Sequence, residues 1–402
     1  MRLQSNSGHL YMQTNETQNR ITHFGRKADG QLDLLKSVPT RGAGSGFFKP
    51  ISGQESAPNS FEGAGSVILA ESNTLLFATN GGDNSVTSFR VSPDGKLTVI
   101  DRQPTGEPVT GRSGTAKSLA YRPQSRTLYV LHAFGPNHVR AYTVAEDGKL
   151  KLRSERHTVN TATKTDRVPT QAVLSPDGRF LLIDILFDAR PAANPDGSPK
   201  LVVANAPDRD GLVIFPVRDD GGTLGKASFA DAGGAGPFYI AFLNRSRDTF
   251  LNGLAVGDGV VVSRIDDEGR ATNGSLVPID TALGKPSELC WLQVTSDNSL
   301  VLATNFGYGT VSTYRLADGR LSLLQDPANE AVPGDGTFRA VNGLVSSGPS
   351  DSWLTPDDRY FHQIFGNASV LVSYRLDKTS GRLTEIGRNP IPYNSPQGLA
   401  GF

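Results

Sequence analysis

Two acidic residues are the best candidates for proton transfer in this sequence. Asp351 lies in the segment SDSWL, and Glu288 lies in the segment SELCWL. A carboxylate that faces a partly desolvated cavity has its pKa raised toward neutrality, which suits a general acid or base. Lys117 and Arg339 could hold an anionic group or stabilise a developing oxyanion. For Glu288, a structural salt bridge stays an open alternative.

Other kinds of site find little support in the residue pattern. No two of the six histidines have the i,i+2 or i,i+4 spacing of a zinc site. The single cysteine, Cys290, excludes a disulfide within the chain. The sequence has no Gly-x-Ser-x-Gly elbow, and its GAGSG run is not followed by the Lys-Ser or Lys-Thr of a phosphate-binding loop. We therefore expect no metal and no cofactor. His132, at the end of the segment LYVLH, could contact a substrate, with a structural role as the alternative.

Composition and charge narrow the class of partner. The chain has 402 residues with 40 basic and 40 acidic side chains, so its formal net charge is zero. Nucleic-acid binding requires a basic surface, and no apolar run approaches the roughly 20 residues of a membrane span. We expect a small-molecule substrate, no nucleic-acid or membrane partner and, on balance, a monomer. The N-terminus lacks an apolar signal segment, which favours the cytoplasm, although an exported protein with its signal removed would look the same.

Seven copies of one hairpin pattern run along the whole chain. Each copy is an apolar strand, a turn built on Asp-Gly or a close variant, and a second short strand. The turn glycines are Gly30, Gly95, Gly148, Gly221, Gly269, Gly319 and Gly381. Glycine supplies the positive φ that a tight hairpin needs. Repetition at a spacing of roughly 50 to 70 residues predicts a repeat array or a propeller.

Each hairpin extends backwards to two further strands, which predicts four-stranded units. The six complete units lie near residues 62–100, 114–154, 168–226, 236–280, 285–326 and 347–389. The first unit, near 8–38, has only three strands, and residues 395–402 resemble the missing one. Pairing them would close a ring and remove exposed sheet edges. The sequence therefore predicts an all-β, seven-bladed β-propeller that forms a single domain over residues 1–402. We expect the longer segments 39–61, 101–113, 155–167, 188–200 and 327–346 to build the mouth of its central channel, with disordered surface loops as the alternative.

Aligning the starts of the blades predicts which side chains meet at the axis. The equivalent positions, which we call the ring positions, are Ser66, Ser118, Gln171, Tyr239, Trp291, Asp351 and Gly398. Lys117 lies one residue before its ring position. This mixture suits a small polar, carboxylated ring compound that stacks on Tyr239 or Trp291 while Lys117 pairs its charge. A plain lining of a water-filled channel is the alternative.

Three motifs carry a resemblance to a known family. The segments LLFATNGGDNSVTSF, LVLATNFGYGTVSTY and SELCWLQVTSDNSLVLATN stand in a seven-fold array without Gly-His and Trp-Asp signatures. The chain thereby resembles, over essentially its whole length, the lactonase family of seven-bladed propellers, which includes 6-phosphogluconolactonase-type and 3-carboxymuconate-lactonizing enzymes. The resemblance implies a lactonase-like enzyme that acts on a small lactone or a carboxylated (muconate- or sugar-acid-like) substrate, as a hydrolase or cycloisomerase. A non-catalytic propeller that binds a small molecule or a protein at the channel mouth is the alternative.

The chain departs from this family at its best-known positions. Better characterised members carry His-Pro-His at one blade start and Gly-Pro-Arg-His at another. The corresponding segments here are Pro169–Gln171 and Gly236–Tyr239, and Asn305 lies in a stretch where an arginine is common. Glu288 and Asp184 match family positions, Asp184 more as a turn cap than as a catalyst. We predict a site with two catalytic residues, Asp351 and Glu288, and seven substrate-binding residues: Lys117, Gln171, Tyr239, Trp291, His132, Arg339 and Asn305.

Overall fold

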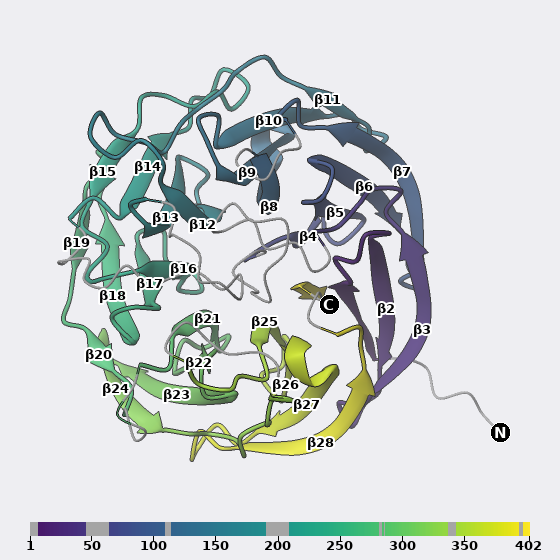
Figure 1. Cartoon of the computed structure of the whole chain (residues 1–402), viewed down its shortest axis with the longest axis vertical. Coiled ribbons are helices and arrows are strands. Elements are labelled where there is room, and N and C mark those ends of the chain that lie inside the picture. Colours follow the sequence, from purple (N-terminus) through teal and green to yellow (C-terminus); the bar gives the residue numbers. More distant parts are fainter. Residues whose placement is uncertain are drawn as a thin grey trace.

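A computed structural model gives the fold of the chain. It describes residues 7–45, 64–108, 114–189, 209–280, 284, 286–336, 343–393 and 397–402. Seven antiparallel sheets surround a central axis like the blades of a propeller (Figure 1). The predicted seven-bladed β-propeller is therefore confirmed. Within the described ranges no helix is long or apolar enough to cross a bilayer.

Each blade has four strands, which run in order from the axis to the rim. We number the blades from the N-terminus, so that blade 1 contains β1 to β3. The strands nearest the axis, from blade 1 to blade 7, are β29 (Gln397–Gly401), β4 (Val67–Ala70), β8 (Gly114–Arg122), β12 (Val168–Leu174), β16 (Pro237–Phe242), β21 (Leu289–Val294) and β25 (Pro349–Leu354). The second strands are β1 (Gly8–Gln13), β5 (Leu75–Asn80), β9 (Thr127–Phe134), β13 (Phe180–Phe187), β17 (Thr249–Leu254), β22 (Leu300–Asn305) and β26 (Tyr360–Phe365).

The third and fourth strands of each blade form the hairpins that the sequence repeats. The third strands are β2 (Arg20–Arg26), β6 (Ser85–Val91), β10 (Val139–Val144), β14 (Leu212–Pro216), β18 (Gly259–Ile265), β23 (Thr310–Ala317) and β27 (Val370–Leu376). The rim strands are β3 (Leu32–Pro39), β7 (Leu97–Pro104), β11 (Leu150–Leu152), β15 (Ser228–Ala230), β19 (Ala271–Asn273), β24 (Arg320–Gln325) and β28 (Leu383–Pro390). A fifth strand, β20 (Val277–Pro278), also pairs with β18. The described residues also contain two short 3-10 turns, η2 (Pro123–Ser125) and η3 (Gly366–Ala368).

The conformation of the turns explains why glycine recurs at them. All seven predicted turn glycines have positive φ, from 73° at Gly319 to 94° at Gly221. An L side chain is strained in that region of φ, whereas glycine is not. The hairpins that these glycines close therefore mark the third and fourth strands of every blade.

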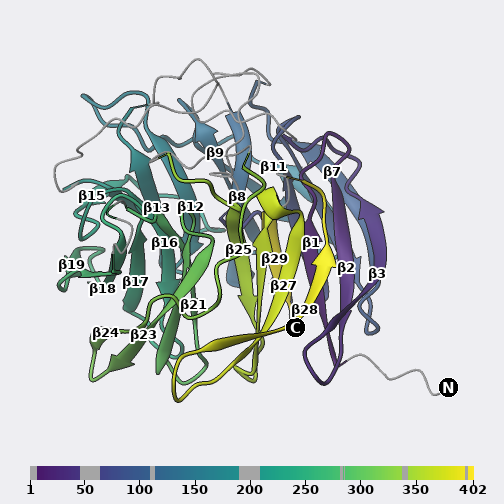
Figure 2. The same cartoon turned by 60° about the horizontal axis from the view of Figure 1, so that its bottom comes forward.

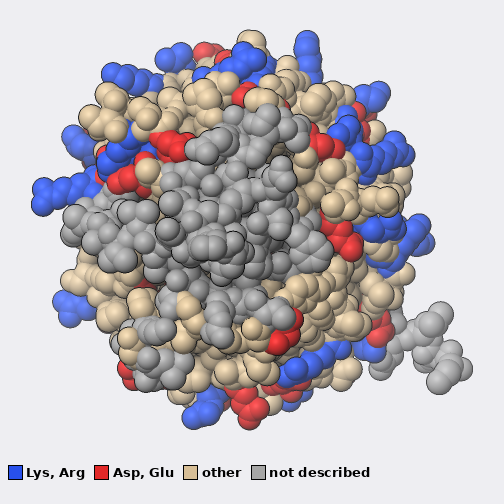
Figure 3. Space-filling model, in the orientation of Figure 1, with Lys and Arg blue, Asp and Glu red and all other residues tan. Residues whose placement is uncertain are grey.

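Packing between blades buries the middle of each sheet. Every residue of the second strands is buried, as in β5 and β13, because neighbouring blades cover both faces of those strands. The rim strands have mixed exposure, as in β28. Basic and acidic side chains are interspersed around the rim of the face shown in Figure 3, in keeping with the zero net charge.

The C-terminal strand closes the ring, as the sequence predicts. Strand β29 pairs antiparallel with β1, with Tyr11 opposite Ala400 and Met12 opposite Leu399. Two further backbone hydrogen bonds join His9 and Phe402, at 2.8 and 3.0 Å. Figure 2 shows β29 beside β1. Blade 1 therefore receives its innermost strand from the opposite end of the sequence. Large parts of the segments expected at the channel mouth, including 46–61 and 190–200, lie outside the described residues.

Candidate functional site

The start of the inner strand has the same backbone geometry in four blades. A residue with left-handed φ lies three positions before the ring position at Thr115, Gly236, Glu288 and Gly348, with φ between 57° and 65°. Shortly after this residue, the pairing register between the inner strand and the second strand shifts in each of these blades. Such a bulge turns the following side chain relative to the regular pleat. This entry turn is therefore a repeated feature of the backbone before four of the ring positions.

The ring positions also join neighbouring blades. Ser118 Oγ accepts a hydrogen bond from the backbone N–H of Ala172 at 3.0 Å. Gln171 Oε1 accepts one from Ile240 at 2.6 Å, and Asp351 Oδ2 accepts one from Leu399 at 3.1 Å. In each case the donor is the residue that follows the ring position of the next blade. These three ring side chains therefore link the inner strands of neighbouring blades.

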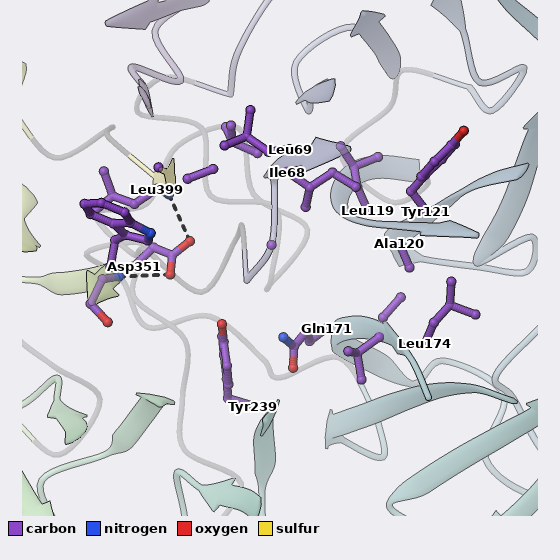
Figure 4. A pocket seen from close by; sticks show the side chains of 18 of the residues that line it. Ile68, Leu69, Leu119, Ala120, Tyr121, Gln171, Leu174, Tyr239, Asp351 and Leu399 are labelled. Atoms are coloured by element: carbon purple, nitrogen blue, oxygen red, sulfur yellow. Dashed lines mark hydrogen bonds between the residues drawn. The ribbon is translucent and has the colours of Figure 1, made fainter. Parts of the chain in front are cut away.

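A cavity of about 530 Å³ occupies the channel between the inner strands. It begins at ring positions, including Gln171, Tyr239 and Asp351, and continues along the strands to Leu174 and Gly401. Figure 4 shows these three ring side chains directed into the cavity. The volume is in the range of small-molecule sites, which is roughly 300 to 1,000 Å³. Three of the residues that the sequence predicts for the site thus share one cavity.

Asp351 is the acidic residue that lines this cavity. Asp351 is only 4 % exposed, and its Oδ1 accepts a hydrogen bond from the backbone N–H of Ser352 at 2.9 Å. Burial raises the pKa of Asp351 to about 7, against the opposing effect of the two backbone donors, Leu399 and Ser352. Desolvation disfavours the charged carboxylate, whereas hydrogen bonds to it favour that form. Asp351 can therefore both accept and release a proton near neutral pH.

Tyr239 and Gln171 provide neutral hydrogen-bond donors in the same cavity. Burial, and secondly the charge of Asp351, raise the pKa of Tyr239, so its hydroxyl stays protonated at neutral pH. The oxygen of the Gln171 amide is used by Ile240, and Figure 4 shows the amide nitrogen on the side facing Tyr239. One carboxyl group and two neutral donors can in principle activate a water molecule and bind a carbonyl oxygen.

Two other residues near the ring contribute to packing. Lys117 is 2 % exposed, and its ammonium group donates to the carbonyl of Pro169 at 3.0 Å. Trp291 is 1 % exposed within an apolar cluster, where its ring meets Phe238 edge-on at a centroid distance of 4.7 Å. Neither is among the described residues that line the cavity.

The remaining predicted site residues lie away from the cavity or outside the described residues. His132 is fully buried, with hydrogen bonds to Thr105 and to the carbonyl of His138, and burial lowers its pKa to about 4. Asn305 donates to Thr310 and Ser312 within its own hairpin. Arg339 lies outside the described residues.

Glu288 occupies the entry turn rather than the ring position. It is 7 % exposed with φ of 57°, and its carbonyl accepts hydrogen bonds from Cys290 Sγ and Phe306 N. It is not among the described residues that line the cavity. Asp184 is not a turn cap, because it lies within β13, fully buried, and accepts a hydrogen bond from Asn252 at 3.2 Å.

Sequence reasoning missed the apolar part of the cavity wall. Ile68, Leu69, Leu119, Leu174 and Leu399 line it, and all five lie one to three residues after a ring position. Their position within three residues after a ring position is the signal that could have identified them. The described residues contain no group of three or more His, Cys, Asp or Glu side chains that could hold a metal ion.

Comparison with known proteins agrees with the seven-bladed propeller fold. A family model for the lactonase seven-bladed β-propeller matches residues 1–113, so the resemblance expected from the sequence is confirmed. No curated protein matches the chain.

Solved structures share the fold over the whole chain. The periplasmic gluconolactonase of Pseudomonas aeruginosa is 16% identical with a TM-score of 0.67, over 98% of both chains. A Bacteroides fragilis protein assigned provisionally as a 6-phosphogluconolactonase is 15% identical with a TM-score of 0.67, over 100% of this chain and 99% of that one. A Lactobacillus plantarum protein is 15% identical with a TM-score of 0.68, over 99% of both chains. At such identities the likeness concerns the fold.

Proposed function

We propose that the protein is a hydrolase that opens the ring of a small lactone in its central cavity. The observation that carries this proposal is the position of Asp351, a buried carboxyl group on the cavity wall beside two neutral donors, Tyr239 and Gln171. The match to the lactonase family and the gluconolactonase among the similar structures support the same reaction class.

The proposed reaction uses water as the nucleophile. Asp351, as a carboxylate, accepts a proton from a water molecule while the water oxygen bonds to the lactone carbonyl carbon. The hydroxyl of Tyr239 and the amide of Gln171 donate hydrogen bonds to the carbonyl oxygen as it gains negative charge. The carbon–oxygen bond of the ring then breaks, and the proton on Asp351 passes to the leaving ring oxygen. The product is a hydroxy acid, and one water molecule is consumed.

Two alternatives follow from the same cavity. A cycloisomerase would form a lactone from an unsaturated acid, and it would have to bind a carboxylate beside Asp351. A propeller that only binds its ligand is favoured by one observation, namely that Asp351 and Gln171 already serve as hydrogen-bond acceptors between blades. Measuring the reaction that the protein catalyses distinguishes the hydrolase, the cycloisomerase and the binding protein.

A panel of lactones assayed by proton release tests the proposal. We expect turnover by the wild-type protein and its loss in Asp351→Asn, with both proteins showing the same circular dichroism spectrum. Binding of lactones without proton release would support the binding protein instead. Lactone formation from muconate-type acids, in the absence of hydrolysis, would support the cycloisomerase.

A further inference from the structure

The charges around the cavity are unusual for a protein expected to bind an anion. Asp351 is the acidic residue among the described lining residues, which include no lysine or arginine. The ammonium group of Lys117 is directed to the carbonyl of Pro169, and Lys117 is not among the lining residues. An anionic ligand would therefore lose its hydration shell beside a carboxylate and meet no described cation in return.

Beyond the polar ring residues, the rest of the described cavity wall is apolar apart from Tyr121, Gln293 and Ser352. Ile68, Leu69, Leu119 and Leu174 lie across from Tyr239 in the view of Figure 4. Tyr121, which also lines the cavity, donates its hydroxyl hydrogen to Glu71, and Glu71 forms an ion pair with Arg126 at 3.1 Å. Opposite charges in such a pair largely cancel at a distance. This part of the wall therefore favours contact with an apolar group of a ligand over contact with a charged group.

The two parts of the cavity point to one substrate class. We infer that the cavity takes uncharged lactones with an apolar substituent, and that it selects against lactones that carry a carboxylate or a phosphate. The carbonyl of the lactone lies at the polar end, beside Asp351, Tyr239 and Gln171. The substituent lies along the apolar wall. This inference adds a substrate class to the proposed hydrolysis, and it relies on that proposal for the orientation of the lactone ring.

A matched pair of substrates tests the inference. One is a γ-lactone with a pentyl tail, and the other is the same ring with a tail of equal length that ends in a carboxylate. We expect the wild-type kcat/KM to favour the uncharged lactone by about tenfold or more, because the charged tail must be desolvated. Equal or faster hydrolysis of the carboxylated lactone would overturn the inference while leaving the hydrolase proposal standing.

A charge placed in the wall sharpens the test. Ile68 is partly exposed on the cavity wall, so Ile68→Lys introduces a cation there, and Ile68→Met is the control of similar length without charge. We expect Ile68→Lys to shift the preference toward the carboxylated lactone by about tenfold, and Ile68→Met to leave it unchanged. The wild-type preference decides the question even where Ile68→Lys does not fold.

Binding distinguishes failure of this inference from failure of the proposed function. If neither lactone is hydrolysed, the hydrolase proposal fails, and titration calorimetry with the same pair then tests the substrate class alone. Tighter binding of the uncharged lactone to the wild-type protein supports the inference. Equal or tighter binding of the carboxylated lactone, or no binding of either, overturns it.

Discussion

Asp351 and Glu288 are both buried acidic residues at the start of an inner strand, yet they lie in different local environments. Asp351 occupies a ring position, where its carboxyl group lines the cavity and accepts a hydrogen bond from the next blade. Glu288 lies three residues before the ring position of its own blade, in the left-handed turn that Gly236 and Gly348 occupy elsewhere. Position within the repeat, rather than residue type, therefore separates a candidate catalyst from a residue of the scaffold.

The largest expected effect separates these two residues directly. Asp351→Asn removes the proton acceptor while keeping the size of the side chain, so we expect kcat/KM for a lactone to fall by about 1,000-fold. The matched change Glu288→Gln should leave kcat/KM within about twofold, because Glu288 is not on the described cavity wall. Initial rates of proton release on both purified variants measure this. An equal loss of kcat/KM in the two variants would show that Asp351 and Glu288 do not differ in their role in catalysis.

The pH dependence of activity gives the second test. Burial raises the pKa of Asp351 to about 7, and the proposed reaction needs the carboxylate form. We therefore expect kcat/KM to rise with pH, to be half-maximal near pH 7, and to be about 100-fold lower at pH 5 than on the plateau. A profile that is flat from pH 5 to pH 8, after correction for spontaneous hydrolysis, would show that Asp351 is not the base.

Stability should change with pH in the opposite direction to activity. Because the pKa of Asp351 is higher in the folded protein than in the unfolded chain, the folded state binds the extra proton between about pH 4 and pH 7. The stability that this proton provides is present at low pH and is lost as the pH rises through about 7. Asp351→Asn should weaken that trend in urea unfolding experiments, and Glu288→Gln should not. An unchanged trend in Asp351→Asn would contradict the raised pKa.

A smaller effect is expected at the neutral donors. Tyr239→Phe removes one hydroxyl from the cavity while the Gln171 amide remains, so we expect kcat to fall on the order of tenfold. The tryptophan at the equivalent ring position offers a matched control, because Trp291 is buried in an apolar cluster. Trp291→Phe should lower the melting temperature more than it lowers kcat. The reverse result would place the site on the Trp291 side of the channel.

The fold could be predicted from the sequence because its signals are local. The strand, turn and second strand around a glycine such as Gly30 or Gly381 identify a hairpin locally, and the count of hairpins gives the count of blades. Ring closure was predictable because one blade lacked a strand and the last residues supplied one.

The candidate site was only partly predictable because it depends on contacts between blades. Tyr239 and Trp291 hold equivalent ring positions, yet Tyr239 lines the cavity and Trp291 is covered by Phe238 of the neighbouring blade. Lys117 could be placed near the axis, but not its hydrogen bond to Pro169, which belongs to another strand. One sequence carries no record of such pairings between distant segments.

The smallest expected effect tests why Glu288 is where it is. A non-glycine residue with φ near 57° is strained by about 1 kcal/mol or more, and glycine is not. Glu288→Gly and Glu288→Ala remove the same side-chain contacts, but only the glycine relieves this strain. We therefore expect the glycine variant to be more stable than the alanine variant by about 1 kcal/mol in urea unfolding, with kcat/KM in both within about twofold of wild type. If the alanine variant is as stable as the glycine variant, position 288 is not strained by the entry turn. The carboxyl group of Glu288 would then again be a candidate for a functional role.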